Sequence, residues 1–282
     1  MNQILFADDS NLITSGTSLH ELETKINIEI PKLVNWLQTN RLSLNIKKTH
    51  IMIFGKKKRG DPLHINIKIE GEKLDIVQST KFLGLILDHE LNWKLHIAYL
   101  TQKIAKSVGI ISRARQLLNA DILRQLYYSF LYPYLNYCTI IWGLAATTTL
   151  APLFRLQKRA IRLICNIKRR DSTIKAFQNL KILRLPDIYT LTVLSFMYNY
   201  KNGKLPHTFN DFYTENNEYH RYPTRGANQL RIPLAKSKIA STFVRKTGVA
   251  LWNSLSPLLE LESVNNIKSF KQKVIALLIS KY

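Results

Sequence analysis

Two adjacent carboxylates, Asp8 and Asp9, stand between the apolar run Ile4–Ala7 and a second apolar pair at Leu12-Ile13. This pattern predicts two short strands joined by a turn at the acidic pair. Side-by-side carboxylates repel each other, and a hard divalent cation such as Mg²⁺ relieves that repulsion. In two-metal sites, such ions stabilise the attacking and leaving oxygens of phosphoryl transfer. The pair is therefore a candidate magnesium site, and the ordinary alternative is a solvated turn.

A phosphoacceptor receiver domain also ends its first strand in paired acids. That fold needs another Asp at the end of a later buried strand. The next strand candidate, Ile51–Phe54, runs instead into Gly55 and the basic run Lys56–Arg59. The sequence therefore disfavours a receiver domain.

The chain is strongly basic, with a formal net charge of +22 over 282 residues. Residues 1–91 carry 12 Lys and Arg against 11 Asp and Glu, whereas residues 92–282 carry 29 against 8. A hydrophobic content of 46% allows a sizeable core and excludes a disordered chain. This asymmetry predicts a near-neutral first part and a basic remainder whose partner is a polyanion, most simply nucleic acid.

The first 91 residues contain both strand and helix signals. Ser18, with Glu21 three residues later, predicts a capped helix that Pro31 kinks or divides. Apolar and polar residues alternate in 65–69, and 74–77 can form a second strand that runs back along it. Together these segments predict a hairpin with one buried face. The apolar segment 82–87 is short enough for a single strand.

Helical periodicity dominates after residue 92. Residues 95–118 carry the apolar stripe Ile97, Leu100, Ile104, Val108 and Ile111, with Lys103, Lys106 and Arg113 on the opposite side. Residues 121–140 predict a helix interrupted at Pro133, and a third helix spans about 150–168. In that third helix Leu156, Ala160, Leu163, Ile164 and Ile167 are expected to face inward, opposite Arg155, Lys158, Arg159 and Arg162. A basic face is often only solvated, but so few acids are available for pairing here that phosphate contact is the better interpretation.

Residues 125–154 carry no charge, which raises the alternative of a membrane span. Pro133, Asn136 and several tyrosines interrupt the apolar run, so two buried helical segments are favoured. Beyond residue 205, two further helices are expected at about 238–254 and 266–281, with Trp252 and Phe270 in the core. The start of the chain shows no secretory signal, so the expected location is the cytoplasm or nucleus rather than outside the cell.

Together these motifs resemble the carboxyl-terminal part of reverse transcriptases of non-LTR retrotransposons, the LINE-like jockey and CR1 type. The box Phe6-Ala7-Asp8-Asp9 is similar to the family's acidic palm hairpin, and 81–84 to its primer-grip segment. The resemblance implies that Asp8 and Asp9 bind Mg²⁺ and that Lys48 lies near the phosphates of the incoming dNTP. It also implies that Phe82, Leu83 and Gly84 lie under the primer end. The basic helices occupy the place of the thumb and would hold the RNA template and DNA primer.

The resemblance implies an α+β chain in three parts: a partial palm in 1–91, made of a small antiparallel sheet with helices, a basic helical thumb in 92–204, and a helical tail in 205–282. The family's palm has a third metal-binding Asp upstream of the acidic hairpin, and only seven residues precede Asp8 here. We therefore expect a fragment of an RNA-directed DNA polymerase that binds template–primer but does not polymerise alone. The alternative is a non-catalytic basic nucleic-acid-binding protein.

Overall fold

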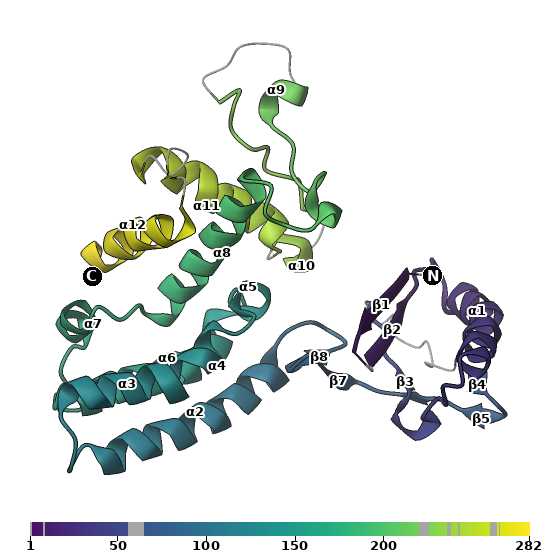
Figure 1. The fold of residues 1–282 in the computed structure, drawn as a ribbon, viewed down its shortest axis with the longest axis horizontal. Coiled ribbons are helices and arrows are strands. Elements are labelled where there is room, and N and C mark those ends of the chain that lie inside the picture. The colour runs from purple at the N-terminus through teal and green to yellow at the C-terminus, as the bar shows by residue number, and fades with distance from the viewer. Residues whose placement is uncertain are drawn as a thin grey trace. The chain divides into compact units, whose positions relative to one another are not determined.

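The computed structural model describes residues 2–7, 9–55, 65–219, 226–235, 238–241, 243–259, 264 and 266–282. The chain divides into two compact units, Met1–Leu91 and Asn92–Tyr282. The described part of the first unit combines short strands with one long helix, and the second unit is built mainly of helices (Figure 1). An α+β class is therefore confirmed.

The strands of the first unit form separate two-stranded pairs rather than the one small antiparallel sheet that was expected. In the described residues, β1 (Asn2–Phe6) pairs with β2 (Asp9–Ile13), β4 (Lys68–Ile69) with β5 (Glu72–Lys73), and β7 (Ser79–Phe82) with β8 (Leu85–Asp88), all antiparallel. The pair of β3 (His50–Ile51) and β6 (Asp75–Ile76) is parallel. Each described strand has a single neighbour, so no continuous sheet forms among these residues.

Helix α1 (Leu19–Thr39) starts where the capping signal predicts. Ser18 Oγ accepts a hydrogen bond from the Glu21 backbone N–H at 3.1 Å, and Glu21 in turn accepts from the backbone and hydroxyl of Thr17. The bond from Lys25 is the largest of the interactions that lower the pKa of Glu21 to about 2. Pro31 lies inside this one helix, so of the two predicted alternatives, a kink or a division into two helices, the division did not occur.

The core of the first unit lies between α1 and the β4–β5 hairpin. Its buried members are Ile30, Ile65, Ile67, Ile69 and Leu74. Asn66 and Lys68, between the buried isoleucines, are exposed. The predicted hairpin with one buried face is therefore confirmed near its turn, at residues 68–73, whereas residues 75–76 of the predicted return strand pair with β3 instead.

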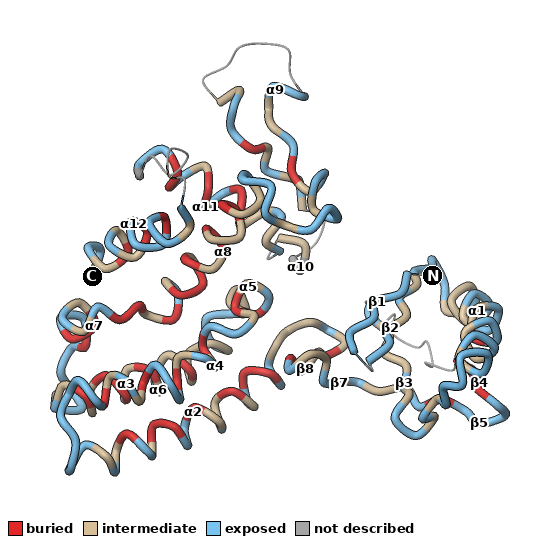
Figure 2. The backbone as a smooth tube through the Cα atoms, in the orientation of Figure 1, coloured by how far each residue is buried: buried red, intermediate tan, exposed pale blue. Residues whose placement is uncertain are grey.

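The second unit contains helices in two groups (Figure 1). In the first group α2 (Lys94–Ala114) packs along α6 (Thr147–Ile164), together with α3 (Ala120–Phe130) and α4 (Tyr132–Asn136). In the second group α8 (Leu185–Lys201) packs against α11 (Val244–Leu259) and α12 (Ile267–Ser280). The shorter helices are α5 (Thr139–Trp142), α7 (Ile174–Leu180), α9 (Asn216–Tyr219) and α10 (Lys238–Ser241), with one 3₁₀ turn at His207–Phe209. The buried residues line the facing sides of the long helices (Figure 2).

The uncharged stretch is divided more finely than its sequence predicts. Residues 121–140 form α3, α4 and the start of α5, with Pro133 in the first turn of α4 and Cys138 in a left-handed conformation before α5. Proline suits a helix start because its missing N–H would have no partner there. No helix in the described ranges has the length and apolarity needed to cross a bilayer.

The expected tail helices are present at α11 and α12, with residues 238–241 forming a separate short helix. Trp252 and Phe270 are both buried, with ring centroids 6.2 Å apart, so their predicted place in the core is confirmed. Tyr198 of α8 adds a third ring 4.5 Å from Phe270. This aromatic stack fixes α12 against α8.

Candidate nucleic-acid interface and acidic hairpin

The β1–β2 hairpin is present, with Phe6 opposite Asp9 in its register. Asp8 lies outside the described residues. Asp9 is exposed, and no group of three His, Cys, Asp or Glu side chains in the described ranges could hold a metal ion. Mg²⁺ takes near-octahedral oxygen coordination and is bound through carboxylates plus substrate phosphates. Of the predicted pair the structure describes Asp9 alone, and we derive no metal-dependent step from it.

Lys48 is the last residue of a short 3₁₀ helix, η1 (Ile46–Lys48), that Asn45 caps. Its side chain is exposed, and the segment that follows it is fixed by His50. His50 Nδ1 lies 3.1 Å from the Lys48 carbonyl oxygen, and His50 Nε2 lies 2.6 Å from Thr80 Oγ1 of β7. The structure therefore brings the Lys48 segment beside the β7–β8 hairpin. The sequence reasoning missed His50, whose only signal was its position directly before the predicted strand Ile51–Phe54.

Phe82, Leu83 and Gly84 form the tip of the β7–β8 hairpin, so the prediction of one continuous strand over 82–87 is wrong. Phe82 pairs with Leu85, and the intervening Leu83 and Gly84 have φ values of 44° and 83°. Two consecutive positive φ angles are the signature of the tight turn that matches the twist of a two-residue hairpin. In the described chain, no hydrogen bond or ion pair links the Asp9 side chain to this tip or to Lys48.

Helix α2 separates an apolar face from a basic one, as its periodicity predicts. The five residues of the predicted apolar stripe are all buried. Lys106 and Arg113 are exposed, and the Lys103 ammonium lies 5.5 Å from the centre of the Tyr99 ring. A lysine over a ring face gains a modest cation–π attraction while it remains available to solvent.

Helix α6 also separates a buried face from a basic one, but its buried face differs from the predicted one. Its buried residues are Leu153, Gln157, Ala160, Ile161 and Ile164, whereas the predicted inward residues Leu156, Leu163 and Ile167 are only half-buried. On the other side, Arg155 and Arg159 are exposed, and the Lys158 ammonium lies 4.3 Å from the Phe154 ring centre. Arg162 Nη2 donates to the Asp171 carbonyl oxygen at 3.1 Å.

We call these two groups of side chains the cationic faces: Lys103, Lys106 and Arg113 of α2, and Arg155, Lys158, Arg159 and Arg162 of α6. Residues 92–204 contain 18 Lys and Arg but only 3 Asp and Glu. The ion pairs found in the described part of the second unit are Arg184–Asp187 and Lys201–Glu215. Neither pair uses a residue of the cationic faces, so no described carboxylate neutralises them directly, and an anion is attracted to them.

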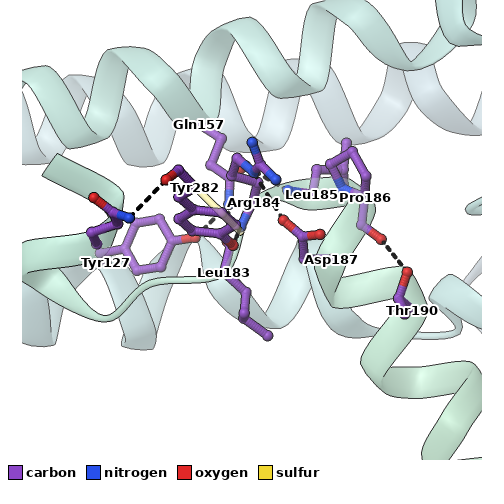
Figure 3. Close-up of polar contacts among 10 residues, drawn as sticks. Tyr127, Gln157, Leu183, Arg184, Leu185, Pro186, Asp187, Thr190 and Tyr282 are labelled. Atoms are coloured by element: carbon purple, nitrogen blue, oxygen red, sulfur yellow. Dashed lines mark hydrogen bonds and ion pairs between the residues drawn. The ribbon is translucent and has the colours of Figure 1, made fainter. Parts of the chain in front are cut away.

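Gln157 fixes the opposite, buried side of α6 (Figure 3). Its Nε2 donates to Tyr127 Oη and to the Leu183 carbonyl oxygen, both at 2.9 Å, and its Oε1 accepts from the Leu185 N–H at 2.9 Å. Burial raises the pKa of Tyr127, so its hydroxyl stays protonated. The sequence signal was available, because Gln157 precedes Ala160, Ile161 and Ile164 at helical spacing and so belongs to their face.

Curated homologues of the chain are RNA-directed DNA polymerases of transposable elements, which confirms the resemblance to non-LTR retrotransposon reverse transcriptases. The chain is 28% identical over 163 residues to the polymerase from mobile element jockey of Drosophila funebris, covering 56% of this chain and 17% of the relative. It is 24% identical over 186 residues to the jockey polymerase of Drosophila melanogaster (64% and 20%). It is 28% identical over 183 residues to the probable polymerase from transposon BS of the same species (62% and 20%).

The matched region spans about a fifth of the length of these relatives. No protein-family model matches the chain. No solved structure matches it either.

Proposed function

We propose that this chain is a carboxyl-terminal portion of a retrotransposon RNA-directed DNA polymerase that binds template–primer nucleic acid. In this proposal the unit Met1–Leu91 is part of the palm, and the helices of 92–204 form the thumb. Its partners are the RNA template, the DNA primer and their hybrid, with a dNTP in the whole polymerase. The names of the homologues support this assignment, because they are polymerases that copy RNA into DNA.

The observation that carries the binding proposal is the pair of cationic faces on α2 and α6. Each helix buries an apolar or uncharged stripe and turns its basic residues away from it. A protein that neutralises nucleic-acid phosphates with Lys and Arg releases their counterions, and that release supplies sequence-independent affinity. The absence of described carboxylate partners leaves these charges available for phosphates.

We further propose that these 282 residues do not extend a primer by themselves. Phosphoryl transfer depends mainly on holding the reacting oxygens and metal ions in position. The acidic hairpin contributes Asp8 and Asp9 from a single turn, whereas the family uses a third Asp from another strand. Asp9 is exposed, and no group of three metal-binding side chains is found in the described ranges, which supports this view.

The binding proposal is tested with a labelled RNA–DNA hybrid and the purified chain, by measuring Kd over a series of salt concentrations. We expect log K to fall linearly with log salt, with a slope of roughly −0.9 for each phosphate contact. Changing Lys106, Arg113, Arg155 and Arg159 together to Gln is expected to make the slope shallower by about two to four.

The matched control changes Lys25 and Lys32 to Gln. These lysines already pair with Glu21 and Glu29 on α1, so the slope is expected to stay within about one of its original value. An equal decrease of the salt slope in the control and in the four-residue variant would contradict a role for the cationic faces.

A second assay, of primer extension, adds Mg²⁺, dNTPs and a primed RNA template. Extension that Asp9→Asn abolishes would show that the chain polymerises alone and would refute the second proposal.

A further inference from the structure

The loop between α6 and α7 carries a serine directly after a basic run. Residues 168–172 are Lys-Arg-Arg-Asp-Ser, and all five are exposed. Ser172 is the only Ser or Thr in the sequence with basic residues at both the second and third positions before it. Many protein kinases select their substrates by charge pattern, and a basic-directed kinase reads cations at these positions.

The local structure holds this loop against the cationic face of α6. Arg162 Nη2 donates to the Asp171 carbonyl oxygen, and the Asp171 N–H donates to the Lys168 carbonyl oxygen at 3.2 Å. Arg162 Nε is shielded from solvent, so its guanidinium lies along the loop rather than in open water. The peptide group that Arg162 binds is the one immediately before Ser172, which places the serine beside this arginine.

We propose that Ser172 is a phosphorylation site for a basic-directed Ser/Thr kinase, and that its phosphate weakens polyanion binding by α6. The γ-phosphoryl group of ATP passes to Ser172 Oγ. The bond between Pγ and the β–γ bridging oxygen breaks, ADP leaves, and the hydroxyl proton goes to the catalytic base of the kinase.

The modification would add a charge of about −1.5 to −2 and three strong acceptor oxygens at neutral pH. Lys168, Arg169 and Arg170 precede the serine in the loop, Arg162 binds the loop at Asp171, and arginine binds phosphate through paired hydrogen bonds. A phosphate held there occupies charges that would otherwise contact nucleic acid. Asp171, next to the serine, does not occupy these cations in the same way as a phosphate would. Its single negative charge is exposed and hydrated, so its attraction to them is weak.

The first arm of the test concerns the site alone. The full 282-residue chain is incubated with Mg²⁺·ATP and the catalytic subunit of cyclic-AMP-dependent protein kinase, and the product is mapped by tandem mass spectrometry. We expect one phosphoryl group on Ser172. It should be absent from Ser172→Ala and strongly reduced when Arg169 and Arg170 are changed to Gln. No incorporation, or incorporation only at other residues, would overturn the site.

The second arm concerns the consequence and rests on the proposed function. Phosphorylated and unmodified chains are compared on the same RNA–DNA hybrid, with Ser172→Ala after kinase treatment as the control. We expect Kd to rise roughly tenfold near 0.15 M salt and the salt slope to become shallower by about one to two. Phosphorylation at Ser172 with unchanged Kd and slope would overturn the switch. If the unmodified chain fails to bind the hybrid at all, the proposed function fails, and the mass-spectrometric arm still decides the site.

Discussion

Gln157 Nε2 lies 2.9 Å from Tyr127 Oη, a hydrogen bond between two completely buried side chains on α6 and α3. The same amide reaches the Leu183 carbonyl oxygen and the Leu185 N–H at the start of α8. One residue therefore joins three helices (Figure 3). It does so from the buried side of α6, whereas Arg155 and Arg159 of the cationic face are exposed.

Replacing Gln157 with Leu should destabilise the second unit strongly. The substitution keeps the volume but leaves the Tyr127 hydroxyl, the Leu183 carbonyl and the Leu185 N–H buried without this partner. Each buried group that loses its hydrogen bond costs about 1–3 kcal/mol, so we expect a total loss of about 3–5 kcal/mol in urea unfolding. The same change at Gln125, which is exposed on α3, should stay within about 0.5 kcal/mol. A similar loss of unfolding free energy in the two variants would contradict the role of the Gln157 hydrogen bonds.

His96 should make the chain less stable in mild acid. It is 1% exposed and its ring packs near those of Trp93, Tyr99 and Trp142. Burial lowers its pKa below the ordinary value of 6.5, so the unfolded chain binds the proton more readily. The contribution of His96 is thus fully present above about pH 6.5 and is lost as the pH falls below that value, by up to about 1.4 kcal/mol per pH unit.

Urea unfolding at pH 7.5 and pH 5.5 tests this expectation. His96→Phe should flatten the pH dependence, whereas His207→Gln, at an exposed position, should leave it unchanged. A wild-type stability that is equal at the two pH values would refute the role of His96.

Gly84→Ala should weaken the β7–β8 hairpin. Gly84 has φ +83° in a two-residue turn, a conformation that costs an L-residue about 1–2 kcal/mol. Leu83, at φ +44°, already bears such a cost, so Leu83→Gly should offset much of the loss. Amide hydrogen exchange of residues 79–88 measures both changes. Faster exchange in Gly84→Ala that Leu83→Gly does not reduce would contradict the turn assignment.

Within the cationic face of α6, the four basic residues should not contribute equally. Arg155 and Arg159 are exposed, whereas Arg162 also holds the Asp171 carbonyl. Arg159→Gln should therefore reduce hybrid binding and make the salt slope shallower by about one, with no loss of stability. Arg162→Gln should reduce both binding and stability, the latter by about 1–2 kcal/mol. Paired measurements of Kd and urea unfolding distinguish these outcomes. A stability loss in Arg159→Gln equal to that of Arg162→Gln would be inconsistent with the contacts.

Local patterns predicted the start of α1, the alternation of Ile65, Ile67 and Ile69, and the stripe of α2, because burial follows directly from the period of each element. The same reasoning failed at 82–87 and at 121–140. A left-handed turn at Leu83-Gly84 and a break at Cys138 depend on neighbouring segments that a short apolar run does not reveal. In the candidate site, the placement of basic residues on one side of each helix was predictable, but the contact between His50 and Thr80 was not.

The sequence by itself determined the charge asymmetry and the resemblance to retrotransposon polymerases, since both depend only on which residues occur and in what order. It also determined which helical faces are basic, since 3.6 residues make one turn. The tertiary structure alone decided which groups Gln157 binds in the core, and that Arg162 holds the loop before Ser172. Hydrogen bonds between residues far apart in the chain depend on how the helices pack, and that packing is a property of the whole unit rather than of any one segment.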